Sequence, residues 1–155
     1  MPDPIIFQSK INFDVVFDEN VKVILPVNLY GCEIGKNSFI GPFVEIQKDV
    51  KVGNNCKIQS HSFICELVEI GNDCFIGHSV VFINDLFSEG KPAQGNKDLW
   101  RKTKIGNNVS IGSNATILPI EICDNVVIGA GAVVTKDISV AGFYVGNPAK
   151  ILKKI

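Results

Sequence analysis

The amino-acid sequence predicts an all-β fold, a parallel β-helix in which short strands turn around a common axis. Three observations predict it: large apolar residues recur at every sixth position, small or β-branched residues follow them at a constant offset, and glycine, asparagine and aspartate recur in between. The 155 residues, of which 46% are hydrophobic, suffice for one domain with an apolar core.

The first observation is a run of nine large apolar residues spaced by six. A period of six fits neither an α-helix, with 3.6 residues per turn, nor a long strand, whose side chains alternate. It is typical of short strands joined by tight corners, with one large and one small side chain pointing inward from each hexad. The large positions are Ile34, Ile40, Ile46, Val52, Ile58, Ile64, Ile70, Ile76 and Phe82.

The second and third observations define the small inward positions and the corners. Gly53-Asn54-Asn55 and Gly71-Asn72-Asp73 suit corners because these residue types tolerate left-handed backbone angles. Three hexads make one triangular coil of roughly 18 residues, and stacked coils pair their strands about 4.8 Å apart. The small inward positions are Ser38, Val44, Val50, Cys56, Ser62, Val68, Cys74 and Val80.

The repeat also assigns the elements along the chain. We expect residues 1–22 to form an irregular starting coil and residues 23–83 and 105–140 to form hexapeptide coils. Residues 141–155 are expected to cap the open end, with a short helix over Ala149–Lys154. The whole chain is therefore expected to be a single β-helix domain.

The segment between the two runs of coils, residues 84–104, lacks the repeat. It contains Gly90, Pro92 and Gly95 and is predicted to form one extruded loop. A loop of about 20 residues is uncommon in a compact domain and is often functional. After the loop the repeat resumes, with one five-residue step at Leu118–Pro119 that indicates a shortened corner.

Composition excludes several classes of protein. The net charge of −1 gives the molecule no overall attraction to nucleic acid or acidic lipid. The sequence lacks a secretory leader and an apolar run of about 20 residues, so we expect a cytoplasmic protein without membrane partners. The five cysteines have neither metal-ligand nor C-x-x-C spacing, so no metal is expected. Cys56 and Cys74 should stack inside the helix as reduced thiols.

These repeats resemble those of the left-handed β-helix acyltransferases. The segments Ile128-Gly-Ala-Gly-Ala-Val-Val-Thr-Lys-Asp137 and Gly146-Asn-Pro-Ala-Lys150 are similar to the acetyl-CoA end of those enzymes. The resemblance covers roughly residues 23–150. It implies a left-handed coil, a homotrimer, and acetyl-CoA as co-substrate in a groove between neighbouring coils.

Three further segments resemble the 3-N-acetyltransferases that act on UDP- or dTDP-linked 3-amino sugars, enzymes of lipopolysaccharide O-antigen biosynthesis. They are Gly41-Pro-Phe-Val-Glu-Ile-Gln47, Ile58-Gln-Ser-His-Ser-Phe-Ile-Cys65 and Gly77-His-Ser-Val-Val-Phe-Ile-Asn-Asp85. In that subfamily the Phe-x-Asn-Asp element opens the active-site loop. The resemblance therefore implies a nucleotide-sugar partner. Because the loop is shorter than in the UDP-glucuronate type, the nucleotide and the sugar stay open.

The expected catalytic residues are Asn84, His78 and Asp85. The two histidines, His61 and His78, lie 17 residues apart, so they should occupy adjacent coils outside the core. Asn84 would orient the thioester or amine, Asp85 would hold the amine or a sugar hydroxyl, and His78 would help the proton leave. The alternative for Asn84 and Asp85 is a capped turn, because both are good turn residues.

Further residues are expected to bind acetyl-CoA and the substrate in the groove between neighbouring coils. Basic residues outnumber acidic ones in the loop and in the tail, which suits the phosphates of CoA and of a nucleotide. His61, Asp85 and Trp100 are expected at the substrate, although Trp100 could equally support the loop. The expected acetyl-CoA contacts are Gly77, Ser113, Ala130, Gly131, Lys136 and Lys150.

Three other functions remain open. An O-acetyltransferase would depend more strongly on a histidine base, because a hydroxyl is a weaker nucleophile than an amine. A metal hydratase of the γ-carbonic anhydrase kind shares the fold, but its site needs three histidines and the chain has two. A non-catalytic β-helix subunit would need neither the extruded loop nor the acetyl-CoA-like end.

Overall fold

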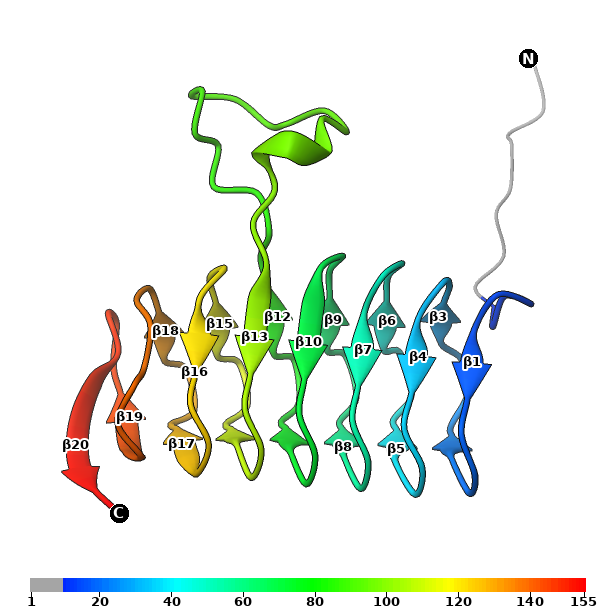
Figure 1. Cartoon of the computed structure of the whole chain (residues 1–155), viewed down its shortest axis with the longest axis horizontal. Helices are drawn as coiled ribbons and strands as arrows, with labels where there is room; N and C mark the ends of the chain where they lie inside the picture. Colours follow the sequence, from blue (N-terminus) through cyan, green and yellow to red (C-terminus); the bar gives the residue numbers. More distant parts are fainter. Residues whose placement is uncertain (1–9) are drawn as a thin grey trace.

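A computed structural model describes residues 10–155 as a left-handed parallel β-helix (Figure 1). The chain runs along three sheets in turn, here called sheets A, B and C, and advances by one coil each time. This confirms the predicted fold class. The expected starting coil at residues 1–22 lies partly outside the described residues, and within them strand β1 (Val16–Phe17) already pairs in parallel with β4 (Glu33–Ile34).

Up to β18 the strands of each sheet stack in chain order, three strands apart, and β19 and β20 then extend sheet C. Sheet A contains β3 (Asn28–Leu29), β6 (Glu45–Ile46), β9 (Phe63–Ile64), β12 (Val81–Phe82), β15 (Thr116–Ile117) and β18 (Val133–Val134). Sheet B contains β1, β4, β7 (Lys51–Val52), β10 (Val68–Ile70), β13 (Thr103–Ile105) and β16 (Glu121–Ile122). Sheet C contains β2 (Lys22–Val23), β5 (Phe39–Ile40), β8 (Lys57–Ile58), β11 (Phe75–Ile76), β14 (Ser110–Ile111), β17 (Val126–Ile128), β19 (Gly142–Val145) and β20 (Lys150–Lys154).

The core is built from the positions that the six-residue period marks. Ile40, Ile58 and Ile76 lie in register on successive coils of sheet C, and each is fully buried. All nine large positions and all eight small ones are buried, as predicted. Burying one isoleucine side chain contributes about 1.5–3 kcal/mol, so stacked columns of such residues hold the coils together.

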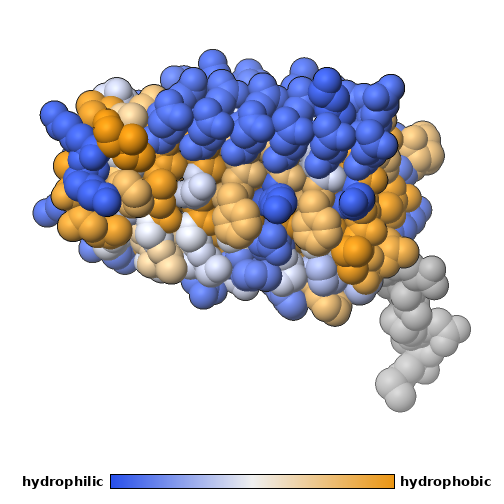
Figure 2. Space-filling view, turned by 90° about the horizontal axis from the view of Figure 1, so that it is seen from below, coloured by the Kyte–Doolittle hydropathy of each residue, from blue (hydrophilic) through white to orange (hydrophobic). Residues whose placement is uncertain are grey.

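The corners divide the surface into three edges, named for the sheets they join. The B–C edge is polar, because a side-chain amide or carboxylate from each coil bonds the next. Asn54 N–H donates to Asn72 Oδ1 at 2.8 Å, and Asn55 Nδ2 donates to Asp73 Oδ1 at 3.0 Å. Gly53 is required at the start of this corner, because a Cβ would lie 2.5 Å from the Gly71 carbonyl oxygen. Figure 2 shows this edge as a hydrophilic band along one side of sheet C.

The small inward positions satisfy their polar atoms with corner carbonyls. Ser62 Oγ donates to Gly77 O at 2.8 Å, and the Cys74 thiol donates in the same way to Gly106 O at 3.1 Å. Cys56 and Cys74 are stacked and free, as predicted, and the Cys56 thiol likewise donates to Gly71 O at 3.1 Å. Both thiols therefore act as small core groups.

The loop leaves the coil at the A–B edge and projects away from the helix (Figure 1). The residues between β12 and β13 are 83–102, so Thr103 and Lys104 already belong to sheet B. The loop contains one 3₁₀ turn, η1 (Lys97–Leu99). No helix within residues 10–155 is long and apolar enough to cross a membrane.

The C-terminal cap consists of strands, and the expected helix over Ala149–Lys154 is wrong. Strand β20 runs antiparallel to β19 and closes the end of sheet C. The physical reason is the open sheet edge: the backbone groups of β19 need hydrogen-bond partners, which a helix would not supply. Lys153 Nζ also lies 4.3 Å from the centre of the Phe143 ring and covers it.

One buried polar group in the core, the Thr103 hydroxyl, leads to a prediction about stability. Thr103 is 1% exposed, and its hydroxyl lacks a hydrogen-bond partner within the described structure. Its register partner on the preceding coil is Val68. Thr103→Val should therefore stabilise the protein by about 1 kcal/mol, because a methyl group of the same size replaces an unpaired buried hydroxyl. Thermal unfolding at equal concentrations should show a midpoint about 2–4 °C higher.

The matched control is Thr116→Val on β15, where the side chain is half-buried on the outer surface of sheet A. It should leave the midpoint almost unchanged. A destabilised Thr103→Val protein would show that the hydroxyl has a partner that the structure does not reveal.

Candidate active site

The predicted site residues lie on two edges of the prism, both of which border sheet A. The loop residues and Lys136 belong to the A–B edge, and the two histidines belong to the C–A edge. Lys150 begins β20, after the last corner of the C–A edge. On the C–A edge are His61, Gly77, His78, Ser113, Ala130 and Gly131, and on the A–B edge are Asn84, Asp85, Trp100 and Lys136.

The corners of the C–A edge stack coil on coil through their backbones. Asn114 N–H donates to His78 O at 2.8 Å, and Gly131 N–H donates to Ser113 O at 2.9 Å. The residue that follows the first glycine of each corner lacks such a bond. Within residues 10–155, no backbone carbonyl accepts the N–H of His78 or Ala130. Gly77 N–H, in contrast, donates to Ile111 O at 2.8 Å.

His78 is exposed, and one of its ring nitrogens is held by the neighbouring coil. Nδ1 lies 2.8 Å from Ser60 Oγ. When Nδ1 carries the ring proton and donates a hydrogen bond to Ser60 Oγ, Nε2 is unprotonated. In this tautomer Nε2 can accept a proton from a substrate. The Ser60 contact thus gives His78 an orientation that suits proton transfer.

His61 lies one coil earlier on the same edge, with its backbone in the left-handed region at φ 64°. Its ring stacks on Phe43, with the ring centres 4.8 Å apart and an angle of 23° between the planes. Phe43 is 57% exposed, so the pair presents a flat aromatic surface to solvent. Such a surface suits stacking with a planar group.

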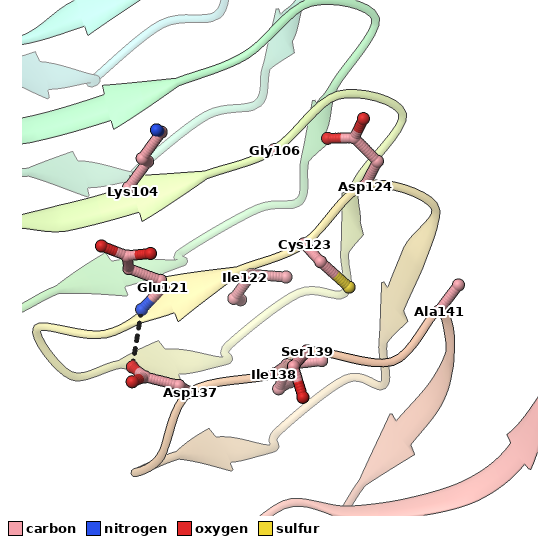
Figure 3. Close-up of a pocket in the computed structure, with 10 residues that line it drawn as sticks. All are labelled: Lys104, Gly106, Glu121, Ile122, Cys123, Asp124, Asp137, Ile138, Ser139 and Ala141. Atoms are coloured by element: carbon pink, nitrogen blue, oxygen red, sulfur yellow. Dashed lines mark hydrogen bonds between the residues drawn. The ribbon is translucent and has the colours of Figure 1, made fainter.

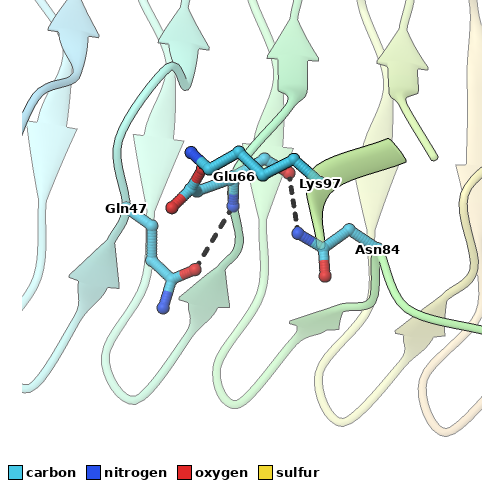
Figure 4. A network of polar contacts seen from close by, with 4 residues as sticks. All are labelled: Gln47, Glu66, Asn84 and Lys97. Carbon is cyan, nitrogen blue, oxygen red and sulfur yellow. Dashed lines mark hydrogen bonds and ion pairs between the residues drawn. The ribbon is translucent and has the colours of Figure 1, made fainter. Parts of the chain in front are cut away.

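Asn84 stands at the foot of the loop and is half-buried. Its side-chain Nδ2 donates to Glu66 O at 3.2 Å (Figure 4). Its backbone carbonyl accepts Arg101 N–H at 2.9 Å. The Glu66 carbonyl oxygen can only accept a hydrogen bond, so the NH₂ group of the Asn84 side chain must face it. This contact fixes the orientation of the Asn84 amide. Its Oδ1 remains as an acceptor at the base of the loop.

Asp85 organises the loop. Its Oδ1 accepts Phe87 N–H at 2.9 Å, and its Oδ2 accepts Ala93 N–H at 2.7 Å. Its backbone also forms an antiparallel bridge with Trp100, so the two ends of the loop meet. Both carboxylate oxygens are therefore engaged by the loop backbone, which is the geometry of a capped turn.

Glu66 was missed by the sequence reasoning. Its side chain is only 15% exposed, and its carboxylate forms an ion pair with Lys97 of the loop (Figure 4). Its backbone N–H donates to Gln47 Oε1 at 3.3 Å, and its carbonyl accepts the Asn84 amide. Spacing could have found it, because Glu66 precedes Asn84 by 18 residues, one full coil.

The environment of Glu66 is partly desolvated and acidic. Burial raises the pKa of Tyr30, and the nearby charges of Glu45 and Glu66 raise it further. The hydrogen bond to Glu66 raises the pKa of Lys97. Lys97 Nζ also lies 5.5 Å from the centre of the Trp100 ring, so Trp100 takes part in holding the loop.

Within one chain, the histidines of the C–A edge and Asn84 of the A–B edge are separated by the width of sheet A. His78 precedes β12 and Asn84 follows it, so they lie at opposite ends of one strand of sheet A. Six residues of fully extended chain span at most about 20 Å, and the corner at Ser79, where φ is 56°, shortens that span. Within one chain the histidines and Asn84 therefore stand at separate corners.

A separate hollow lies away from both edges of the candidate site (Figure 3). It has a volume of about 750 Å³ and lies beside β13 and β16, at the C-terminal end of sheet B. Glu121, Asp124 and Asp137 line it with a single lysine, and Asp137 Oδ1 accepts Glu121 N–H at 2.9 Å. Three carboxylates disfavour CoA or a nucleotide, both of which carry phosphates. In residues 10–155, no three His, Cys, Asp or Glu side chains gather as a metal site.

Two segments of the chain match known repeat families. Residues 31–66 match the bacterial transferase hexapeptide, and residues 102–136 match the hexapeptide repeat of succinyl-transferase. These matches confirm the resemblance to hexapeptide-repeat transferases. Among curated proteins, the bifunctional protein GlmU of Streptococcus uberis is 35% identical over 127 residues, which are 80% of this chain and 25% of that protein. The chain thus spans about a quarter of that relative.

Solved acyltransferases share the fold. AntD from Bacillus cereus, an N-acyltransferase solved in complex with dTDP and coenzyme A, superposes with a TM-score of 0.77 at 22% identity. The match covers 92% of this chain and 84% of that one. A maltose O-acetyltransferase from Clostridium difficile superposes with a TM-score of 0.56 at 29% identity, over 92% of this chain and 70% of that one.

The ion pair between Glu66 and Lys97 leads to a prediction about the loop. Lys97→Met should loosen residues 85–102, because it removes the charge that ties the loop to the half-buried Glu66 carboxylate. Hydrogen exchange of the loop amides should become faster, whereas the coil amides should be unchanged. Lys97→Arg should restore protection, and Lys91→Met, on an exposed residue of the same loop, should have no effect. Unchanged exchange in Lys97→Met would mean that Asp85 alone holds the loop.

Proposed function

We propose that this chain, which carries the hexapeptide repeats of bacterial transferases, is an acetyl-CoA-dependent N-acetyltransferase. Its substrate would be the 3-amino group of a dTDP- or UDP-linked amino sugar. The observation that carries the proposal is the Asn84 amide, whose Nδ2 is held by Glu66 O so that its Oδ1 faces outward as an acceptor at the base of the loop. AntD, which shares the fold, was solved with dTDP and coenzyme A.

The chemistry requires a neutral amine, a stabilised oxyanion and a proton acceptor. A sugar amine beside electron-withdrawing oxygens is less basic than a lysine, whose reference pKa is about 10.4. A useful fraction is therefore neutral near pH 7 without a strong base. The main tasks of the site are then to position the amine and to stabilise the oxyanion.

Asn84 would position the amine, and residues of the C–A edge would stabilise the oxyanion. Asn84 Oδ1 would accept an N–H of the amine, which directs the nitrogen lone pair toward the thioester. The nitrogen attacks the thioester carbonyl, and the oxyanion is received by the free N–H of His78 or Ala130. The tetrahedral intermediate then expels the CoA thiolate. His78 Nε2 or that thiolate takes the proton that the nitrogen loses.

Acetyl-CoA suits the C–A edge near the C-terminal end of the helix. Ser113, Ala130 and Gly131 are small, and a Cβ at Gly131 would meet no atom within 4 Å, so the edge is open there. Lys150 is exposed and would meet the phosphates, and Lys136, which is exposed on the A–B edge, would do so from an adjacent chain. In this proposal Asp85 and Trp100 shape the loop over the sugar nucleotide, and His61 with Phe43 offers a stacking surface to the substrate.

The site would be completed by a second chain, in a homotrimer. His78 and Asn84 lie at opposite ends of β12, so a complete set of groups arises only where one chain meets another. A C3 arrangement makes three equivalent meetings of this kind and closes on itself.

An O-acetyltransferase is the second candidate, and one contact favours it. Ser60 holds His78 in an orientation that suits a general base, which a sugar hydroxyl needs more than an amine does. The similar maltose O-acetyltransferase shows that this fold supports the chemistry. A non-catalytic β-helix subunit remains the outcome if acetyl-CoA does not bind.

The function is tested with the purified protein, acetyl-CoA, and matched sugar nucleotides that carry a 3-amino or a 3-hydroxyl group. We expect release of CoA with the 3-amino compound and an acetamide product that survives alkaline hydroxylamine. An ester product, which hydroxylamine cleaves, would instead establish O-acetylation. The thermal midpoint should rise with CoA, because a ligand that binds only the native state stabilises it. No rise with CoA or acetyl-CoA would overturn both transferase proposals.

The mechanism predicts unequal roles for the two side chains. Asn84→Ala should lower kcat more than His78→Ala does, because it removes the group that orients the amine. The loss in His78→Ala should be about tenfold, at the low end for acid–base help. The pH–rate profile of His78→Ala should still rise with the pKa of the substrate amine. A loss of about 10⁴-fold in His78→Ala, with binding intact, would make the histidine an obligatory base and favour O-acetylation.

A further inference from the structure

The outer face of sheet C carries a hollow that lies apart from the candidate active site. Its volume is about 500 Å³, and in a triangular prism sheet C stands opposite the A–B edge, which carries Asn84 and the loop. We propose that this hollow is a second binding site, in which a nucleoside phosphate binds without entering the candidate active site. The lining residues are Asn20, Lys22, Asn37, Phe39, Lys57 and Gln59.

The middle of the hollow is the side chain of Phe39, and a lysine stands on each side of it. In the register of sheet C, Phe39 pairs with Lys22 on the preceding coil and with Lys57 on the following coil. Neighbouring strands lie about 4.8 Å apart, so the backbones of the two lysines are roughly 10 Å from each other. Both lysines are exposed, whereas Phe39 is half-buried. Figure 2 shows hydrophilic side chains between hydrophobic ones along this row.

The charged groups that line the hollow are both positive. Within residues 10–155, neither Lys22 nor Lys57 forms an ion pair with a carboxylate. A hollow on sheet B has the opposite character: it places Lys51 beside Glu33, and Lys51 Nζ lies 3.9 Å from Glu33 Oε1. Two ammonium groups without a carboxylate among the lining residues favour an anionic ligand, and a phosphate is the anion that can accept hydrogen bonds from both.

The ring of Phe39 is uncovered by the lysines beside it. At the other end of the same sheet, Lys153 covers Phe143, with its Nζ 4.3 Å from the centre of the ring. In the part of the chain that the structure describes, no lysine lies over Phe39 in this way. A flat ring can therefore stack on Phe39, and nucleobases stack on aromatic side chains in this manner.

Amide side chains border the hollow on both sides of the sheet. On the B–C edge, Asn20 Nδ2 donates to Asn37 Oδ1 at 3.3 Å, and Asn37 Nδ2 donates to Asn55 Oδ1 at 3.2 Å. Each NH₂ group carries two hydrogens, so both asparagines keep a second donor. Gln59 follows β8 on the side of the C–A edge and adds a third amide. Amides donate and accept hydrogen bonds, as the polar edges of nucleobases do.

These three kinds of group identify the ligand by its chemistry. A phosphate would be bound by Lys22 and Lys57, and a planar base would stack on Phe39 with its polar edge toward the amides. An inorganic phosphate would leave the aromatic ring unused, and an aromatic ring without a charge would leave the lysines unused. A nucleoside monophosphate is the simplest ligand that uses all three, and a volume of about 500 Å³ is within the range of small-molecule sites.

Binding is tested with GMP, whose base occurs neither in CoA nor in a dTDP- or UDP-linked sugar. Guanosine lacks the phosphate, and ribose 5-phosphate lacks the base. In calorimetric titrations of the whole chain, GMP should bind about tenfold more tightly than either, because each of them loses one kind of contact. Added salt should weaken GMP binding, because it screens the attraction between the lysines and the phosphate. Equal affinities for GMP and ribose 5-phosphate would reveal a plain anion site and contradict the proposal, as would the absence of GMP binding.

Matched variants locate the bound GMP. Lys57→Met keeps an unbranched side chain and removes the charge, so GMP binding should weaken about tenfold. Phe39→Leu should weaken it by a similar factor through lost stacking, and ribose 5-phosphate binding should stay unchanged. The control is Lys51→Met, on an exposed lysine of sheet B, which should bind GMP as the parent protein does. Lys57 is exposed, so its replacement decides the test even if Phe39→Leu does not fold.

The result is independent of the proposed function, because GMP binding is measured without acetyl-CoA or an amino sugar. Asn84→Ala should bind GMP as tightly as the parent protein, because Asn84 follows β12 on the opposite edge of the prism. Circular dichroism of every variant verifies folding. Loss of GMP binding in Asn84→Ala, together with unchanged binding in Lys57→Met, would place the nucleotide at the loop and refute a second site on sheet C.

Discussion

Every feature of this protein depends on the requirement that each coil stack on the next at the spacing of paired strands. That spacing leaves room for one large and one small side chain per hexad, which is why Ile40, Ile58 and Ile76 repeat without variation and are fully buried. No coil buries its apolar face alone, so the stability of each depends on its neighbours. The same spacing brings Asn54 to Asn72 and Cys56 to Cys74, and the corner and core ladders follow from it.

Because the core leaves little freedom, function is confined to the edges, the outer faces and the single interruption of the repeat. The loop could be inserted only at a corner, since an insertion within a strand would shift every later side chain to the wrong face. At that corner Asp85 closes the loop, Asn84 is held by Glu66, and Lys97 ties the far part of the loop back to the coil. The site residues therefore occupy positions that the stacking does not use.

The flat outer faces matter as much as the edges. An alternating charge row is favourable along sheet B, where Lys51 meets Glu33 and Glu69. The outward row of sheet C, which begins with lysines that alternate with phenylalanines, has a different character. One rigid prism can thus carry outer faces of different charge without any change in its core.

The sequence by itself determined the fold, because the six-residue period states which side chains point inward and leaves one topology that buries them. It also predicted the loop and the stacked cysteines. It did not predict the strand β20, because the need to pair the open edge of β19 arises only once the sheet exists. It missed Glu66, whose carboxylate gains its role from a loop residue 31 positions away. Only the tertiary structure decided that His78 and Asn84 stand at opposite ends of one strand, because the distance between two corners is set by the length of the face between them.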